Sequence, residues 1–306
     1  MPIFDRKKSQ SRWPALILAI IAFLSVNAFS AAATVEPAAG DSAFTDDSTD
    51  YVVSWSGRYL FAVIDDSRKN PPLHRIFLVE TAHPDQRTVI GDYECKGFAG
   101  VYCSTDEQWL SVNVAFPVHR GECHVFKNVA EHRFVEVAKP KINDTVQSIF
   151  ERNAKNHFSF FTFDTVSGLY WKGDTLILLA SDRGRNNGDF DDEMFLQYDP
   201  AKGQIDPLSK HFVSPMGADA GAKPDPEYEQ WDSASLKAYE QSLQHQLKVI
   251  CNLLLAKLDA AKKAELASEQ EQWELTRDKK SPGRYERDLF VQKRINTLSA
   301  RFMVLR

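Results

Sequence analysis

The sequence has few of the residues that mark specialised protein classes. Its 306 residues include only four cysteines, 14 glycines and 14 prolines. These low counts exclude a disulfide-rich miniprotein, a collagen-like chain and a low-complexity protein. The length is sufficient for about two domains, each able to bury a hydrophobic core.

The sequence also lacks the motifs of several common chemistries. None of its eight histidines forms a His-x-x-x-His pair, and there is no Cys-x-x-Cys pair, so the spacing indicates no zinc site. A Gly-x-Ser-x-Gly elbow, a phosphate-binding loop and a dinucleotide-binding glycine motif are absent too. The sequence therefore predicts no cofactor and gives no direct indication of an enzyme.

Long apolar runs are absent except for one near the start, at 15–26. Basic residues precede this run and small residues follow it, a pattern typical of a secretory signal peptide. The run is shorter than the roughly 20 residues of a membrane-spanning helix. We expect residues 1–33 to be removed and the protein to be periplasmic or secreted, with no membrane span; an uncleaved membrane anchor is the alternative.

The formal net charge of −5 conceals two regions of opposite sign. Residues 34–234 contain 19 basic and 32 acidic side chains, a net charge of −13. Residues 235–306 contain 14 basic and nine acidic side chains, a net charge of +5. An acidic surface repels nucleic acid and attracts cationic partners. The charge pattern therefore excludes nucleic acid as a partner and favours a cationic one.

Strand patterns dominate the sequence from 51 to 213, after a small, acidic and flexible lead-in at 34–50. Three stretches follow one plan, in which an aromatic residue precedes a polar turn and a β-branched or aromatic strand follows it. Leu60, Leu110 and Leu176 occupy the same position in the three stretches, 50 and 66 residues apart. The sequence predicts an antiparallel, all-β domain over 51–213.

The first of these stretches, Ser-Trp-Ser-Gly-Arg-Tyr-Leu at 54–60, resembles the strand–turn–strand signature of β-propeller blades, although the usual Asp before the Gly is absent. The resemblance implies a propeller-like meander. Three units are fewer than the four to eight blades of a closed propeller. An ordinary antiparallel sandwich or open meander is therefore favoured, with the propeller-like meander as the alternative architecture.

The loop at 182–193 is the one candidate for a cation site. Its carboxylates could bind Ca²⁺, and the nearest candidates are Asp189, Asp191, Asp192 and Glu193. An EF-hand register would place Arg183 at the first ligand position, where arginine cannot coordinate. Asn187-Gly188 is instead a strong hairpin signal, so a solvated hairpin loop is favoured over a metal site.

Export permits disulfide bonds. Cys95 and Cys103 flank a plausible turn and are the first choice for a bridge. A bridge between Cys103 and Cys123 on neighbouring strands is the runner-up. Buried free thiols are the alternative to both.

The pattern changes after a Pro- and Gly-containing segment at 214–231, which is typical of a linker. Apolar side chains then recur every third or fourth residue, as on one face of an α-helix. They are Leu236, Tyr239, Leu243, Leu247, Ile250, Leu254, Leu258 and Ala261. The sequence predicts a small helical hairpin or bundle over 232–306.

The second part of this helical region carries a recognisable motif, formed by Leu266, Gln270, Trp273, Arg277 and Asp278. It is similar to the core motif of the lysozyme-inhibitor LprI-like domain, a small helical module of bacterial envelope proteins. The resemblance covers about 232–306 and implies lysozyme inhibition for some members. The motif residues are expected to hold helices together, with Trp273 anchoring one helix to its neighbour. The family's usual cysteine is replaced by Ser281, so packing must replace the disulfide.

Together these features predict an α+β protein with an antiparallel β domain followed by a separate helical domain. The favoured function is a non-catalytic binding protein of the bacterial envelope with lysozyme-inhibitor-like activity and a cationic partner such as lysozyme. The alternatives are a hydrolase or glycan-acting enzyme with its site in the β domain, or a structural assembly factor.

Overall fold

A computed structural model describes most of the chain beyond the first 48 residues. The described ranges are 49–66, 73–94, 97–115, 121–130, 133–137, 141–153, 165–183, 190–209, 212–215, 226–280 and 283–305. The expected signal peptide at 1–33 lies outside them, as does all of the expected lead-in at 34–50 except its last two residues. Over the described residues, no helix is both long and apolar enough to span a membrane.

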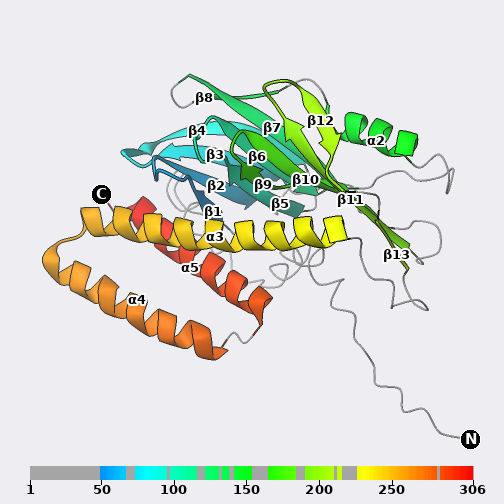
Figure 1. Cartoon of the computed structure of the whole chain (residues 1–306). Coiled ribbons are helices and arrows are strands. Elements are labelled where there is room, and N and C mark those ends of the chain that lie inside the picture. Colours follow the sequence, from blue (N-terminus) through cyan, green and yellow to red (C-terminus); the bar gives the residue numbers. More distant parts are fainter. Residues whose placement is uncertain are drawn as a thin grey trace, which may run out of the picture.

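Three consecutive four-stranded antiparallel meanders make up the β region, and we call them units 1, 2 and 3 (Figure 1). The strands of unit 1 are β1 (Asp50–Val53), β2 (Tyr59–Asp66), β3 (Leu73–Glu80) and β4 (His83–Glu94). Those of unit 2 are β5 (Gly97–Cys103), β6 (Trp109–Ala115), β7 (Gly121–Ala130) and β8 (Arg133–Glu136). Those of unit 3 are β9 (Thr165–Lys172), β10 (Thr175–Arg183), β11 (Phe190–Asp199) and β12 (Gln204–Pro207).

Units 2 and 3 are continuous with each other, whereas unit 1 is a separate sheet. One parallel pairing, between Gly121 and Thr165, joins β7 to β9. Helix α2 (Ile142–Asn153) lies between the two units in sequence, and β13 (Phe212–Pro215) pairs with β11. Three helices follow: α3 (Pro226–Lys257), α4 (Ala260–Lys280) and α5 (Arg284–Val304). The predicted α+β class, an antiparallel β region followed by a helical one, is confirmed.

Alternate residues of each strand point to opposite faces of its sheet, so each unit can pack against a neighbour on both faces. One face of unit 1 meets one face of unit 2 in a core that contains Tyr59, Phe61, Ile76, Leu110, Val112 and Phe126. The opposite face of unit 2 meets unit 3 and α2 in a second core, which contains Trp109, Val125, Val146, Leu176, Leu178 and Tyr198.

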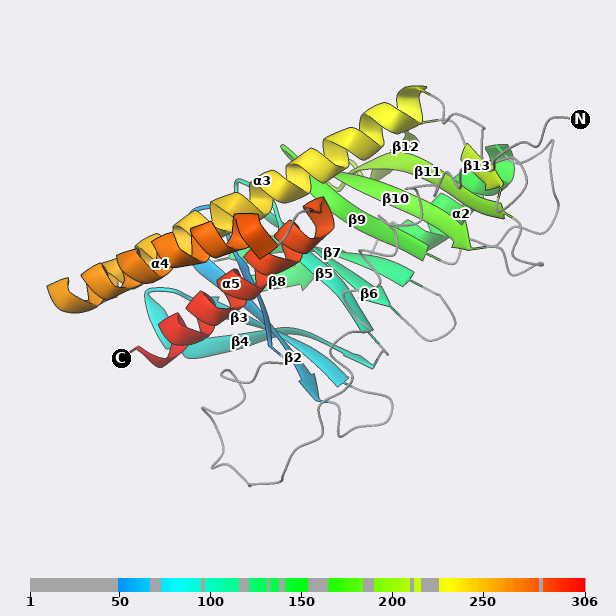
Figure 2. The same cartoon turned by 90° about the horizontal axis from the view of Figure 1, so that it is seen from below.

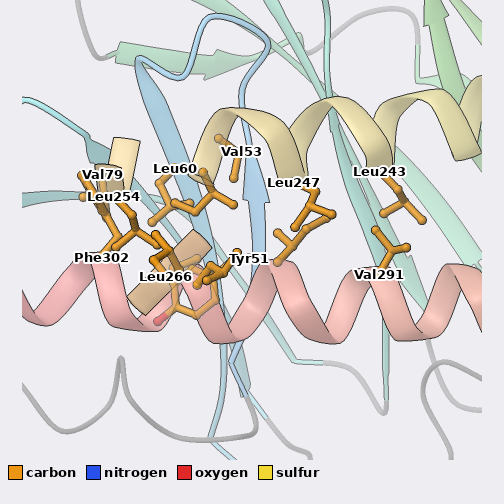
Figure 3. Packing of buried hydrophobic residues seen from close by; sticks show 14 of the residues in the cluster. Tyr51, Val53, Leu60, Val79, Leu243, Leu247, Leu254, Leu266, Val291 and Phe302 are labelled. Atoms are coloured by element: carbon orange, nitrogen blue, oxygen red, sulfur yellow. The ribbon is translucent and has the colours of Figure 1, made fainter. Parts of the chain in front are cut away.

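The helices cover the two faces that this stacking leaves uncovered. The outer face of unit 1 shares a core with all three tail helices, including Leu60, Val79, Leu254, Leu266 and Phe302. The outer face of unit 3 packs against Trp231, near the start of α3. Helix α3 therefore runs from unit 3 to unit 1 (Figure 2). Figure 3 shows α3 and α5 meeting over unit 1, where Leu243 and Val291 point toward each other.

The aligned leucines show that successive units pack in the same direction. Each occupies the start of the second strand of its unit, as the sequence repeat predicts. Leu176 of unit 3 faces unit 2, and Leu110 of unit 2 faces unit 1. Leu60 of unit 1 faces the helices. The helical region thus occupies the place of a preceding unit beside unit 1, and α3 also contacts unit 3.

Strand β1 lies at the edge of its sheet, and the tail helices satisfy its outward-facing backbone groups. The amide nitrogens of Tyr51 and Val53 donate to Asn296 Oδ1 at 3.0 Å and Gln246 Oε1 at 2.9 Å. The Nε2 atom of Gln292 donates to the Tyr51 carbonyl oxygen at 3.0 Å. An exposed strand edge would otherwise pair with another chain. Three side-chain amides replace the missing neighbouring strand.

Two elements extend into the segment 214–231 that the sequence predicts as a linker. Helix α3 begins at Pro226, inside the segment 214–231 predicted as a linker, and β13 extends to Pro215. Proline suits the first turn of a helix, where its missing N–H is not needed. The helical region is not packed as an independent body, because its apolar stripe and unit 1 form one core.

Gly57 lies where the first turn of unit 1 approaches α3. Its φ is +77°, and a Cβ there would lie 2.6 Å from Val249 Cγ1 of α3. Gly173 occupies the corresponding turn of unit 3, with a φ of +60° and no atom within 4 Å of a Cβ. The two glycines share their backbone conformation but differ in their surroundings.

We expect Gly57→Ala to destabilise the protein more than Gly173→Ala. Both substitutions incur the left-handed penalty of about 1 kcal/mol. Only Gly57→Ala also crowds a β-branched side chain on α3, which adds about 1–3 kcal/mol. Urea unfolding of the two variants measures the difference, and equal losses would contradict the close approach of the turn to α3.

Candidate functional site

The first turns of units 1 and 2 have the same construction. Ser54 and Ser104 begin these turns, and their Oγ atoms accept hydrogen bonds from the backbone amides of Tyr59 and Trp109 at 3.0 and 2.9 Å. In each turn the amide of the serine also donates to the carbonyl oxygen five residues later, at 2.9 Å. Serine favours such turns because its hydroxyl bonds nearby backbone groups. The repeat therefore places two rigid turns in equivalent positions.

The fourth residue of each turn adopts a left-handed backbone conformation. It is Gly57 in unit 1 and Glu107 in unit 2, where φ is +60°. A non-glycine residue is disfavoured in this conformation. The Glu107 carboxylate reaches the other turn, where its Oε1 accepts from Ser56 N at 2.8 Å and from Ser56 Oγ at 2.6 Å. Glu107 therefore ties the turn of unit 2 to that of unit 1.

A histidine of α3 reaches the same turn from the other side. His245 Nε2 lies 2.7 Å from the carbonyl oxygen of Trp55. A carbonyl only accepts hydrogen bonds, so Nε2 carries the proton. The rings of His245 and Trp55 are stacked, with centroids 3.7 Å apart and an interplanar angle of 10°. Trp55 nevertheless stays 45% exposed.

We call Trp55, Ser56, Glu107 and His245 the turn cluster. It joins unit 1, unit 2 and α3 at one peptide group, because His245 holds the carbonyl of Trp55 and Glu107 holds the N–H of Ser56. His245 Nε2 and Glu107 Oε1 are already engaged in these contacts. The arrangement presents a fixed aromatic surface, which is suited to binding.

The tail motif builds a different cluster, centred on a residue that the sequence motif did not contain. Arg294 of α5 is almost buried, and its Nη1 donates to Glu269 Oε1 at 2.6 Å. Its Nε donates to Gln270 Oε1 at 3.2 Å, and its guanidinium lies 6.0 Å from the Trp273 ring. Arg301 contacts the second oxygen of Glu269 at 3.0 Å. These contacts fasten α4 to α5.

The other motif residues have positions that suit this structural role. Trp273 stacks on Phe290 of α5 with ring centroids 5.4 Å apart. Leu266 is buried in the core shared with unit 1. The Arg277 guanidinium lies 5.4 Å from the Trp273 ring on the same helix, and Asp278 follows it in α4.

The remaining predicted sites are only partly described. The thiols of Cys103, Cys123 and Cys251 are free, and Cys95 lies outside the described residues. Cys103 is on β5 and Cys123 on β7, with β6 between them. Two strand spacings are about 10 Å, too far for a disulfide. The runner-up pairing of Cys103 with Cys123 is therefore absent, and burial raises the pKa of both thiols.

In the candidate cation loop, Asp189 lies outside the described residues. Asp191 and Asp192 are part of β11, and the side chain of Glu193 is buried. Strand pairing extends through this segment, with Asp191 opposite Arg183. In the described part of the chain, no group of three or more His, Cys, Asp or Glu side chains is placed to hold a metal ion.

A histidine–carboxylate contact joins β7 and β8, the last two strands of unit 2. His124 Nδ1 lies 2.7 Å from Glu136 Oε1, and its Nε2 lies 3.7 Å from Glu122 Oε2. The hydrogen bond from His124 lowers the pKa of Glu136. The Tyr93 ring of unit 1 lies 5.1 Å from the imidazole. Both imidazole nitrogens face carboxylates, which suits an ion pair between strands.

Comparisons with known proteins give no family. No protein-family model matches the sequence, and no curated protein sequence matches it. The resemblance of the tail to the LprI-like domain therefore stays a prediction. Among solved structures, TolB from Acinetobacter baumannii is 12% identical over 57% of this chain, with a TM-score of 0.30.

Two archaeal structures show similar likenesses. The β-propeller domain of the Trilobed protease from Pyrococcus furiosus is 14% identical over 55% of this chain, with a TM-score of 0.32. The acylaminoacyl peptidase from Pyrococcus horikoshii is 11% identical over 56% of this chain, with a TM-score of 0.33. The chain spans less than half the length of each of these three proteins. TM-scores this low support no inference of a shared function.

Sequence reasoning missed the turn cluster as a site. Aligning the three units would have shown one signal, since Glu107 replaces a glycine that units 1 and 3 retain. No local pattern could have paired Trp55 with His245, because 190 residues separate them. The cluster depends on the return of α3 to unit 1.

We expect Arg294→Met to destabilise the protein by about 2 kcal/mol, because it removes the buried partner of Glu269 and Gln270. Arg301→Met is the matched control. It removes the second partner of Glu269, but this side chain is 31% exposed and the loss should stay below about 1 kcal/mol. Thermal unfolding of both variants checks the order, which an equal effect would contradict.

We expect Asp288→Asn to stabilise the protein above pH 6. Burial, followed by the nearby Glu240 carboxylate, raises the pKa of Asp288 to about 6. The folded state then binds more protons than the unfolded state between about pH 4 and 6, so this group costs stability as the pH rises through that window. Because the side chain is only half-buried, the gain should be about 1 kcal/mol.

Urea unfolding of Asp288→Asn at pH 4 and at pH 7.5 measures this effect. The exposed Glu271→Gln on α4 is the control and should leave the pH dependence unchanged. A variant that gained no stability at pH 7.5 would show that the raised pKa does not describe Asp288.

Proposed function

We propose that this protein is a non-catalytic binding protein of the bacterial envelope that contacts a cationic protein through the turn cluster. The observation that carries the proposal is the state of Trp55, which is 45% exposed and yet fixed by its stack on His245. Exposed tryptophans that are already ordered make effective interface anchors, because little side-chain entropy is lost on binding.

The charge of the β region supports a cationic partner. Residues 34–234 have a net charge of −13, and the turn cluster includes Glu107 beside the exposed Asp106. Net negative charge over such a region raises the rate of association with a basic protein. One face of the indole of Trp55 is covered by His245, and a lysine or arginine side chain could stack on the other as a cation–π contact.

The location follows from the sequence. The leader expected at 1–33 would deliver the protein to the periplasm or the exterior. Lysozyme is a cationic protein of that environment, and the tail resembles a domain of lysozyme inhibitors. We therefore propose lysozyme as the first partner to test. The basic tail would repel lysozyme, so contact is assigned to the β region.

We expect the chain beginning at Thr34 to bind lysozyme and to slow lysis in a turbidity assay. Trp55→Ala should weaken binding about 30-fold, the effect of losing an interface anchor worth about 2 kcal/mol. Binding should also weaken as salt is added, because charges attract the partners. Calorimetric titration gives the affinities.

Leu275→Ala is the matched control. Leu275 is an apolar side chain on α4, 53% exposed and outside the turn cluster, and its loss should leave the affinity unchanged. Unaltered lysis rates with no binding heat would remove lysozyme as the partner. Equal affinities of Trp55→Ala and the parent would remove the turn cluster as the contact.

A further inference from the structure

We propose that Glu107 is the positioning residue of the turn cluster, retained in a strained conformation so that Trp55 is presented in one orientation. This inference rests on the proposed function, because it gives the exposed indole a binding role. Glu107 itself need not touch the partner, since its side chain is 8% exposed.

The backbone of Glu107 is the first argument. Among the residues that the structure describes, Glu107 is the only non-glycine residue with a positive φ. The corresponding residues of units 1 and 3 are Gly57 and Gly173, so the turn itself is compatible with glycine. Strained backbone persists where the surroundings fix it, and it concentrates at functional sites. A glutamate at this position therefore needs a reason other than turn formation.

The contacts of Glu107 supply that reason. Its amide donates to Ser104 O at 3.0 Å, and its carbonyl oxygen accepts from Asn128 Nδ2 at 3.3 Å. With its backbone held by its own unit, the carboxylate takes both donors of Ser56 in unit 1. A glycine in this turn could form the backbone bonds but not the contact with Ser56.

The peptide group between Trp55 and Ser56 links this contact to the indole. Its N–H is held by Glu107 from unit 2, and its C=O is held by His245 from α3. Holding both polar atoms fixes the plane of the peptide and so the direction of the Trp55 side chain. The His245 ring then supports one face of the indole. Loss of Glu107 should free the N–H of this peptide group while the fold remains.

Two substitutions separate positioning from stability. Glu107→Gly removes the carboxylate and also relieves the backbone strain, so the urea midpoint should fall little or rise. Glu107→Gln keeps the strain and an amide oxygen that can still accept from Ser56. The readout is the heteronuclear NOE of the Trp55 indole N–H, assigned through the signal that disappears in Trp55→Phe.

In the chain beginning at Thr34, we expect Glu107→Gly to lower the NOE of the Trp55 indole alone among the five tryptophans, and Glu107→Gln to keep it close to the parent value. Where lysozyme binds the parent, Glu107→Gly should weaken that binding about tenfold, because the freed indole must be ordered on binding. A merely structural Glu107 would instead loosen all tryptophans together with the loss of stability.

The inference is overturned if Trp55 stays as ordered in Glu107→Gly as in the parent, or if all five indoles loosen together. These outcomes are distinct from failure of the proposed function. Absence of lysozyme binding removes that partner but leaves the NOE result to decide the role of Glu107. Lysozyme binding that depends on Trp55 but not on Glu107 would remove only the positioning role.

Discussion

The architecture depends on how the backbone edge of β1 is satisfied. A strand at the edge of a sheet carries unpaired N–H and C=O groups, and burying them without partners is costly. Gln246 of α3 and Gln292 and Asn296 of α5 supply those partners. Because these side chains bond the edge, helices can lie where another strand would be needed. These bonds act together with the apolar core that unit 1 shares with the helices.

Side-chain amides also bond backbone groups at two other places, between elements that do not pair with each other. Asn113 of β6 bonds both the N–H and the C=O of Gly168 in β9, each at 2.7 Å. Asn143 at the start of α2 bonds Gly121 O and Cys123 N of β7, beyond the single pairing of β7 with β9. A side-chain amide offers both a donor group and an acceptor oxygen, as a peptide group does. These residues link elements whose backbones do not pair.

Local patterns in the sequence predicted the elements but not their assembly. The aligned leucines marked three equivalent strands, and the stripe that includes Leu247 and Ile250 marked the buried face of α3. The strand and helix periods are local properties, which is why they can be read from a single sequence. The boundary at Pro226 and the shared core of unit 1 and the tail depend on contacts between distant residues. The turn cluster was missed for the same reason.

The bond between Asp50 and Asn296 has a kinetic consequence. These residues are 246 positions apart, yet the Nδ2 atom of Asn296 donates to Asp50 Oδ1 at 2.8 Å. At about 5–20 residues per second, the ribosome makes the second partner roughly 10–50 s after the first. Until then the apolar side of the first meander stays uncovered, and contacts so distant in sequence form slowly. The nascent chain therefore depends on its final helix to mature, and early termination of translation would release an aggregation-prone product.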